Sequence, residues 1–288
     1  MVSLLKPIGH CFGVLNAIKI AKEVKEKYID KSIYVFGLLV HNEIVTKELE
    51  ELGIKTIEFN KDNAIEKLKK FTSNDAVIFS AHGHPYAYEK ILKDNNVMFF
   101  DATCSKVKDC FDIIKASKEV IYIGKDNHPE TLAALTMNNN AHLYDIKSKF
   151  DYQKVNTVNP LVINQTTLSF LELKDIHEEI KNQLPRASIN DEICNATLLR
   201  QKAISSLDDN VDLIVVVGSK KSSNTMKLYE IAKEKHINKK VLLVNNVDEL
   251  KECKLEFANA VIASGTSTPM TEIEKVKEYL EGLENERK

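Results

Sequence analysis

Three of the five cysteines recur at a nearly constant interval along this sequence. Cys11, Cys104 and Cys194 lie 93 and 90 residues apart, and each follows a short apolar run and precedes a segment of helical period. Thiolates are soft ligands that select zinc, copper(I) or iron–sulfur centres. Structural zinc usually draws on close C-x-x-C pairs, which this sequence lacks. We therefore expect the three thiolates to share one central iron–sulfur cluster that forms only when the whole chain folds.

A cluster held in this way would have a particular reactivity. If three thiolates hold four irons, one iron lacks a protein sulfur and can act as a Lewis acid toward a substrate oxygen. The other two cysteines, Cys110 and Cys253, fall outside the interval. We interpret them as packing or surface thiols.

Polar turns also recur in each third of the chain. One set lies 24 to 30 residues after each cysteine and a second set 62 to 73 residues after it, always where a strand-like segment ends. Functional groups gather at the carboxyl ends of parallel strands, where helix N-termini favour anions. The side chains at these turns include donors suited to phosphate oxygens, and no arginine stands among them. We expect a small diphosphate ester to be bound by His41, His82, Ser222, Ser223, Asn224 and Ser267.

Glu130, two residues after His128, offers a proton at one of these turns. A carboxyl group of raised pKa could protonate a leaving hydroxyl there, with Thr166 orienting that hydroxyl. The alternative is that Glu130 is a charge in the first turn of a helix, which stabilises only the helix dipole. Histidines and serines at such turns are likewise often structural, so only their convergence on one site favours a catalytic role.

The elements that must position these residues are alternating strands and helices. Short β-branched runs predict buried parallel strands at 32–40, 76–80, 97–101, 120–124, 161–164, 213–218 and 260–264. Helical periodicity predicts helices at 14–28, 44–52, 64–71, 173–184, 197–206, 225–235 and 271–282. Together with the cysteine interval, this predicts an α/β trefoil around the central cluster. Its three pseudo-equivalent small domains, each with a mainly parallel sheet, would span residues 1–96, 97–186 and 187–288.

The composition excludes several classes of protein. The 288 residues carry 40 basic and 42 acidic side chains, so the net charge of −2 provides no general attraction to nucleic acid or an anionic membrane. The longest apolar runs are too short to span a bilayer, and the first residues do not form a secretory signal. An odd number of dispersed cysteines is typical of a reducing compartment rather than a disulfide scaffold. We therefore expect a cytoplasmic protein.

The sequence resembles the hydroxymethylbutenyl diphosphate reductase family, whose members catalyse the last step of the methylerythritol phosphate route to isoprenoid precursors. The resemblance covers essentially the whole chain, and it depends on the order and spacing of motifs that are individually short. These motifs are Gly9-His10-Cys11-Phe12-Gly13-Val14, Val40-His41-Asn42, Ser80-Ala81-His82-Gly83, Asp101-Ala102-Thr103-Cys104, His128-Pro129-Glu130, Gln165-Thr166-Thr167, Ile193-Cys194-Asn195-Ala196-Thr197, Ser222-Ser223-Asn224 and Ser264-Gly265-Thr266-Ser267.

The resemblance implies an activity, a cofactor and partners. It implies a monomer with one 4Fe-4S cluster on Cys11, Cys104 and Cys194, which reductively dehydroxylates 4-hydroxy-3-methylbut-2-enyl diphosphate to isopentenyl and dimethylallyl diphosphate. Glu130 would donate a proton, with Thr166 and His128 beside it and in contact with the substrate. Electrons would come from a ferredoxin or flavodoxin, because the chain shows no flavin or nicotinamide fingerprint of its own.

Two other interpretations of the same cysteines stay open on the sequence alone. A zinc-stabilised protein that binds a phosphorylated metabolite would use one histidine as the fourth ligand and would be colourless. A hydro-lyase with an open-iron cluster would need no electron donor. Metal and sulfide content distinguishes the first of these, and dependence on a reductant distinguishes the second.

Overall fold

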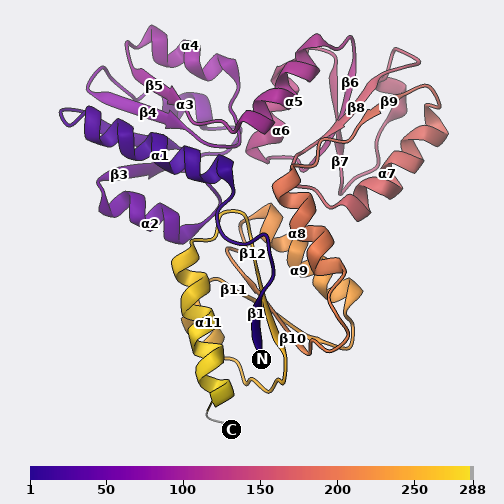
Figure 1. The fold of residues 1–288 in the computed structure, drawn as a ribbon. Helices are drawn as coiled ribbons and strands as arrows, with labels where there is room; N and C mark the ends of the chain where they lie inside the picture. The colour runs from indigo at the N-terminus through magenta and orange to yellow at the C-terminus, as the bar shows by residue number, and fades with distance from the viewer. Residues whose placement is uncertain (286–288) are drawn as a thin grey trace. The chain divides into compact units, whose positions relative to one another are not determined.

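The strands form three separate four-stranded parallel sheets. The computed structural model describes residues 1–285, and Figure 1 shows the arrangement of strands and helices within each sheet. The first sheet has the order β3 (Ile54–Ile57), β2 (Ser32–Phe36), β4 (Asp75–Phe79) and β5 (Met98–Asp101); the second has the order β7 (Ala141–Asp145), β6 (Val120–Gly124), β8 (Leu161–Asn164) and β9 (Ser188–Asn190). The third contains β11 (Lys240–Val244), β10 (Leu213–Val217), β12 (Ala260–Ser264) and β1 (Val2–Leu4). The predicted α/β class, with three mainly parallel sheets, is confirmed.

Helices connect these strands, as parallel pairing requires. They are α1 (Phe12–Lys27), α2 (Glu43–Glu51), α3 (Ala64–Leu68), α4 (Tyr86–Asp94), α5 (Ser105–Ala116), α6 (Pro129–Thr136), α7 (Phe170–Gln183), α8 (Asn195–Ser205), α9 (Ser223–Lys235), α10 (Val247–Lys251) and α11 (Met270–Asn285), with a 3₁₀ turn at Tyr152–Lys154. None of the helices described in residues 1–285 is both long and apolar enough to cross a bilayer.

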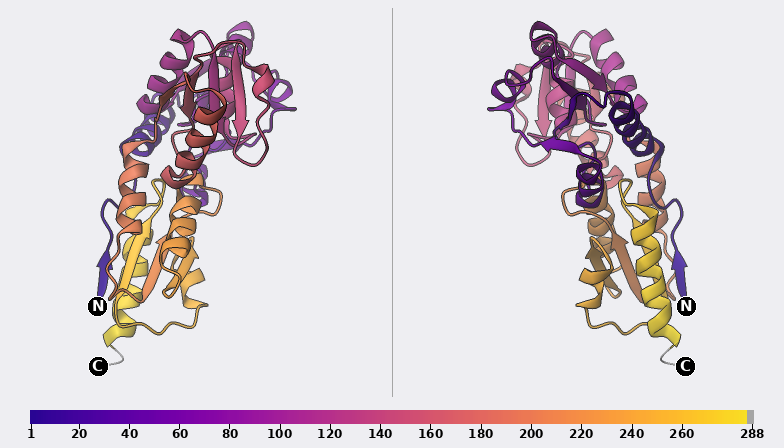
Figure 2. Two further views of the ribbon diagram at one scale, coloured as in Figure 1. Left: turned by 90° about the vertical axis from the view of Figure 1, so that its right-hand side faces the viewer. Right: turned by 90° about the vertical axis from the view of Figure 1, so that its left-hand side faces the viewer.

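Burial on both faces explains why the central strands are rich in β-branched residues. Every residue of β10 is fully buried. Leu213, Val215 and Val217 belong to one core cluster with residues of α11, whereas α9 also contacts β10. Alternate side chains of a strand point to opposite faces, so a strand covered on both faces must be apolar throughout. The two side views in Figure 2 show helices along both faces of this sheet.

The three sheets share one order, in which the two central strands lead to the polar turns. In each sheet the strand at one edge, which is β1, β5 or β9, leads instead toward a cysteine. Each cysteine therefore follows a strand at the edge of a sheet. The strand before Cys11, β1, joins the third sheet by pairing with β12.

The predicted boundaries at 96/97 and 186/187 cut ahead of β5 and β9, which hydrogen bond to the preceding sheet. The spacing of residues in the sequence indicates the length of a repeat. It does not indicate where each repeat begins, because that depends on which strands pair. The predicted strand at 32–40 is likewise shorter in the structure and ends at Phe36, before a turn at Gly37 with a φ of +83°.

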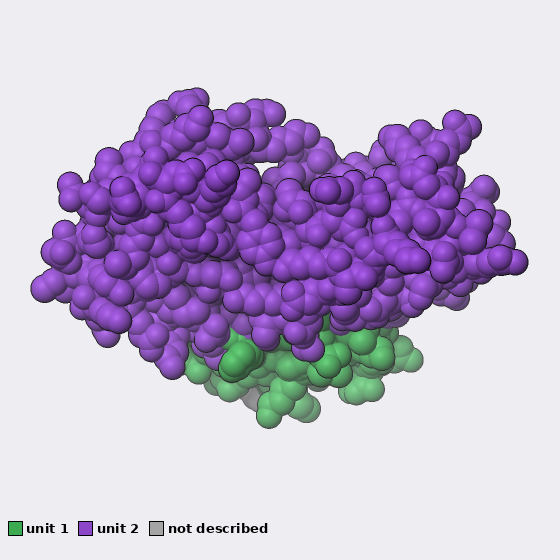
Figure 3. All heavy atoms as spheres, turned by 90° about the horizontal axis from the view of Figure 1, so that it is seen from above, with its two compact units in different colours: residues 1–12, 41–45, 194–288 green, residues 13–40, 46–193 purple. Residues whose placement is uncertain are grey.

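The chain divides into two compact units, which Figure 3 shows in different colours. Unit 1 contains residues 1–12, 41–45 and 194–288, and so includes the third sheet. Unit 2 contains residues 13–40 and 46–193, with the first two sheets.

Candidate active site

The three cysteines of the predicted cluster stand at the starts of helices. Cys104 and Cys194 are the N-cap residues of α5 and α8, and Cys11 directly precedes α1. A helix N-terminus favours the thiolate, which is the form that binds metal. Cys11 and Cys194 belong to unit 1 and Cys104 to unit 2. In residues 1–285 no three His, Cys, Asp or Glu side chains lie close enough to hold a metal ion by themselves.

The other two cysteines serve packing. Cys110 is 1% exposed and belongs to a core cluster with Val107 and Phe111. Burial raises the pKa of its thiol well above the ordinary value, so this sulfur stays protonated. Cys253 packs against the core of the third sheet.

A buried arginine joins the Cys11 and Cys194 turns in unit 1. Arg200, on α8, is 5% exposed, and its Nη1 and Nη2 donate to the carbonyls of Ala196 (2.8 Å) and Gly9 (2.6 Å). Burial lowers the pKa of the guanidinium, while the nearby sulfurs of Cys11 and Cys194 raise it.

The predicted phosphate-binding turns of unit 1 also meet. The Ser267 hydroxyl donates to the carbonyl of His41 (3.2 Å), and the N–H of Cys11 donates to the carbonyl of Thr266 (3.0 Å). A Cβ added to Gly218 would lie 2.9 Å, and one added to Gly265 2.0 Å, from the Thr225 hydroxyl oxygen. Only glycine lets the turns after β10 and β12 pack this closely against the first turn of α9.

The first turn of α9 contains a buried amide without a hydrogen-bond partner among the described residues. Ser222 caps the helix, since its hydroxyl accepts from the N–H of Thr225 (3.3 Å), and Ser223 beside it is 8% exposed. Asn224 is 2% exposed, and neither Oδ1 nor Nδ2 has a hydrogen-bond partner among the described residues. Leaving a buried amide unpaired costs about 1–3 kcal/mol, so the side chain is suited to a ligand.

In unit 2, the carboxyl group of Glu130 is buried against three donors. It is 1% exposed. The N–H of Thr166 donates to Oε1 (2.8 Å), the hydroxyl of Thr166 lies 2.9 Å from Oε2, and the hydroxyl of Tyr122 donates to Oε1 (3.2 Å). Burial raises the pKa of Glu130 to about 7, although hydrogen bonds from Thr166 and Tyr122 lower it. A carboxyl group with this pKa can both hold and release a proton near neutral pH.

Two histidines lie beside this carboxyl group. His128 caps α6, and its Nδ1 accepts from the N–H of Glu130 (3.2 Å), which puts the proton of the neutral imidazole on Nε2. The ring of His82 lies edge-on to that of His128, with 5.6 Å between the centroids. Unit 2 therefore brings together the predicted residues His82, His128, Glu130 and Thr166.

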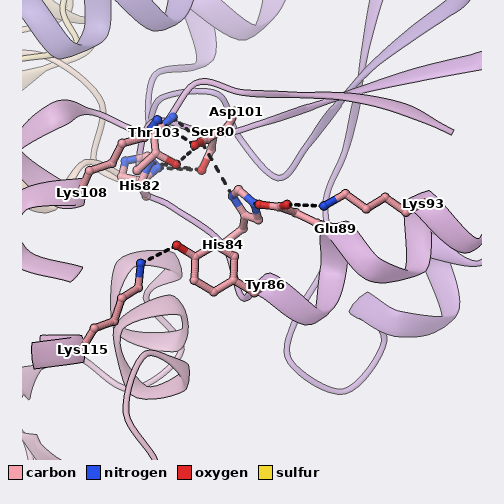
Figure 4. Close-up of polar contacts among 10 residues, drawn as sticks. All are labelled: Ser80, His82, His84, Tyr86, Glu89, Lys93, Asp101, Thr103, Lys108 and Lys115. Atoms are coloured by element: carbon pink, nitrogen blue, oxygen red, sulfur yellow. Dashed lines mark hydrogen bonds and ion pairs between the residues drawn. The ribbon is translucent and has the colours of Figure 1, made fainter. Parts of the chain in front are cut away.

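The turn that ends at Cys104 is bonded to the turn that carries His82. The N–H of Cys104 donates to the carbonyl of Ala81 (3.0 Å), which precedes His82. Asp101 accepts from the Thr103 N–H (2.9 Å) and pairs with Lys108 (2.8 Å), as Figure 4 shows. These contacts fix the backbone that leads into Cys104.

Tyr122 and Arg200 are the two residues that the sequence analysis missed at these sites. Tyr122 lies inside the apolar run of β6, where nothing distinguishes it from a core residue. Arg200 carries a usable signal, because only three of the 40 basic residues in the chain are arginines.

Comparisons with known proteins agree on one family. A family model described as LytB protein matches residues 2–281. Among the curated relatives, proteins of Bacillus licheniformis and Bacillus subtilis (strain 168) are each 34% identical to this chain, cover 98% of it, and are matched over 91% of their own length. Both are named 4-hydroxy-3-methylbut-2-enyl diphosphate reductase.

Solved structures of the same enzyme share the fold. The reductase of Plasmodium falciparum superposes with a TM-score of 0.81 at 28% identity, covering 98% of this chain and 87% of that one. A second structure, described as the terminal enzyme of the non-mevalonate pathway, superposes with a TM-score of 0.68 at 26% identity, covering 98% of this chain and 99% of its own.

Proposed function

The chain belongs to the LytB protein family, and we propose from this membership that it reduces 4-hydroxy-3-methylbut-2-enyl diphosphate in the terminal step of the non-mevalonate pathway. The reaction adds two electrons and two protons to the substrate and releases its allylic hydroxyl as water. The products are isopentenyl and dimethylallyl diphosphate. The single observation in the structure that carries this function is the buried carboxyl group of Glu130, which has the hydroxyl of Thr166 2.9 Å from its Oε2.

The cofactor in this proposal is one 4Fe-4S cluster on Cys11, Cys104 and Cys194. The donors fit the group, since all three are thiols at helix starts and none is in a disulfide, and the buried guanidinium of Arg200 provides positive charge beside two of them. When bound, the cluster supplies electrons and a metal corner that polarises the substrate hydroxyl.

The side chains of unit 2 deliver the proton. Oε1 of Glu130 already accepts two hydrogen bonds, so the acidic proton resides on Oε2, 2.9 Å from the Thr166 hydroxyl. Thr166 gives its own hydroxyl proton to the departing hydroxyl of the substrate and takes the Oε2 proton of Glu130 in its place. The Nε2–H of His128 orients the substrate next to this pair.

The diphosphate binds to donors at the polar turns, which are His41, His82, Ser222, Ser223, Asn224 and Ser267. The unpaired amide of Asn224 supports this role most directly. A ferredoxin or flavodoxin supplies the electrons, and the enzyme acts as a monomer in the cytoplasm, in keeping with its free cysteines.

Iron and acid-labile sulfide analysis of protein purified without oxygen tests the cofactor. We expect about four irons per chain in the unmodified protein and in Cys110→Ser, and a large loss of iron in Cys194→Ser. Equal losses in the two variants contradict the ligand assignment. A colourless zinc protein contradicts the reductase, and turnover without reduced ferredoxin supports a hydro-lyase instead.

A further inference from the structure

Arg200 is a buried cation in unit 1 with no carboxylate to balance it. Its two Nη atoms are bonded to carbonyls, and its Nε has no hydrogen-bond partner among the described residues. Within residues 1–285 no acidic side chain lies at ion-pair distance from the guanidinium. Burying an unbalanced charge is costly in a protein interior, so a buried arginine indicates an anion close by.

The contacts of Arg200 indicate which anion this is. Ala196 lies two residues after Cys194, and Gly9 lies two residues before Cys11, so one planar side chain bridges the backbone beside both thiols. The sulfurs of Cys11 and Cys194 favour the charged form of the guanidinium and so raise the pKa of Arg200 against the effect of burial. The neighbouring anion is therefore whatever forms at Cys11 and Cys194.

We propose that Arg200 holds the Cys11 and Cys194 turns together and, as a permanent positive charge beside their sulfurs, raises the reduction potential of the cluster that binds there. This role rests on the proposed function. A cluster that gains one electron from the external donor becomes more negative, and a nearby positive charge favours that reduced form.

The choice of arginine fits both parts of this role. A lysine ammonium keeps the charge but reaches only one of the two carbonyls, because it is a point donor, whereas the guanidinium fork serves both. The guanidinium also stays charged when buried, since its ordinary pKa lies far above neutral pH. The chain uses lysine for nearly all its other basic residues.

Three variants separate charge from positioning. Arg200→Gln removes the charge and keeps a donor of similar length, Arg200→Lys keeps the charge and loses the fork, and Arg186→Gln makes the same change at an exposed arginine. The measurements are iron per chain and the cluster's reduction potential, determined anaerobically by spectroscopic titration.

We expect Arg200→Gln to lower the equilibrium constant for one-electron reduction about tenfold, which is about 59 mV. Arg200→Lys should retain most of the potential but bind less iron, and Arg186→Gln should match the unmodified protein.

A potential in Arg200→Gln equal to that of Arg186→Gln overturns the proposal. If Arg200→Gln binds no cluster, the potential of the cluster in Arg200→Lys tests the proposal instead. Because Arg200→Lys keeps the positive charge, a potential well below that of the unmodified protein contradicts a role for the charge. Absence of iron and sulfide from the unmodified protein is a different result, since it refutes the reductase itself.

Discussion

At the scale of the residue, Glu130 is the group that supplies the proton in the proposed reaction. Glu130→Gln keeps the shape and most hydrogen bonds of the side chain but removes its proton. We expect kcat to fall by about 10²–10⁴-fold while the iron content stays unchanged, because proton delivery fails and the cofactor ligands are untouched. Steady-state kinetics with a chemical reductant, next to iron analysis of the same sample, measures both. Near-normal turnover would show that Glu130 is only a charge at the start of α6.

The same side chain makes stability depend on pH. Its folded pKa is about 7 and its unfolded value 4.5, so the folded protein binds this proton more tightly than the unfolded chain. The stabilisation is complete below pH 4.5 and is lost as the pH rises through 7. Between pH 4 and pH 8, Glu130→Gln should therefore gain about 3 kcal/mol in unfolding free energy relative to the unmodified protein. Urea unfolding at both pH values measures this, and a constant difference would mean that the carboxyl group is not desolvated.

Residue types and spacing select the candidate residues at the strand ends but do not select Tyr122. Glu130, Thr166 and the histidines stand at strand ends, where polar residues have no packing role that hides them. Tyr122 occupies a fully buried position in β6, and only the fold shows that its hydroxyl reaches Glu130. Apolar periodicity predicts where a side chain points but not which polar group it meets.

At the scale of the element, the central strands could be predicted and most edge strands could not. All six central strands were predicted, from β2 and β4 in the first sheet to β10 and β12 in the third. The five strands missed, β1, β3, β7, β9 and β11, all lie at sheet edges. An edge strand is less buried, so its sequence contains more polar residues, as Ile54–Ile57 illustrates with one buried residue in four.

At one edge of the second sheet, the side chain of Glu119 bonds to β7 and to the loop at 156–157. Glu119 directly precedes β6. Its carboxylate accepts from the N–H groups of Asn156 (2.9 Å) and Thr157 (2.6 Å) and contacts His142 of β7 (2.9 Å). Burial raises the pKa of Glu119, but these hydrogen bonds outweigh burial and lower the pKa to about 2. The carboxylate thus fixes the 156–157 loop to the second sheet.

We expect Glu119→Gln to destabilise the protein by about 2 kcal/mol at pH 7, because a charged acceptor is lost. The folded pKa is depressed, so this stabilisation is present above pH 4.5 and is lost as the pH falls toward 2, and the difference between the proteins should shrink at pH 3. Urea unfolding at pH 7 and pH 3 measures it. Glu178→Gln, at an exposed position, should change stability by no more than about 0.5 kcal/mol. An equal effect of the two substitutions would show that the loop is held by other contacts.

At the scale of the whole molecule, the N-terminal strand shows why the cysteine interval alone does not reveal how the third sheet is completed. β1 pairs with β12, so residues 2–4 register with residues 260–262 at the other end of the chain. Nothing local in Val2–Leu4 indicates that partner, because a strand of three residues carries almost no periodicity. The interval between cysteines was visible, whereas the pairing that closes the third sheet depends on contacts distant in sequence.

This pairing predicts that a change near residue 4 acts on the third sheet alone. Leu4 packs against the core that contains Val215 and Ile262. Replacing it with alanine removes part of a half-buried side chain, so we expect unit 1 to lose about 1–2 kcal/mol of stability. Hydrogen exchange should then show weaker protection of the β10 and β12 amides, while protection in β2 and β4 of unit 2 stays as it was. Ile237→Ala, at a side chain in unit 1 that is 80% exposed, serves as the control and should leave both sheets unchanged. Equal loss of protection in both units would mean that the chain unfolds as one cooperative body, and that β1 stabilises the molecule rather than its own sheet.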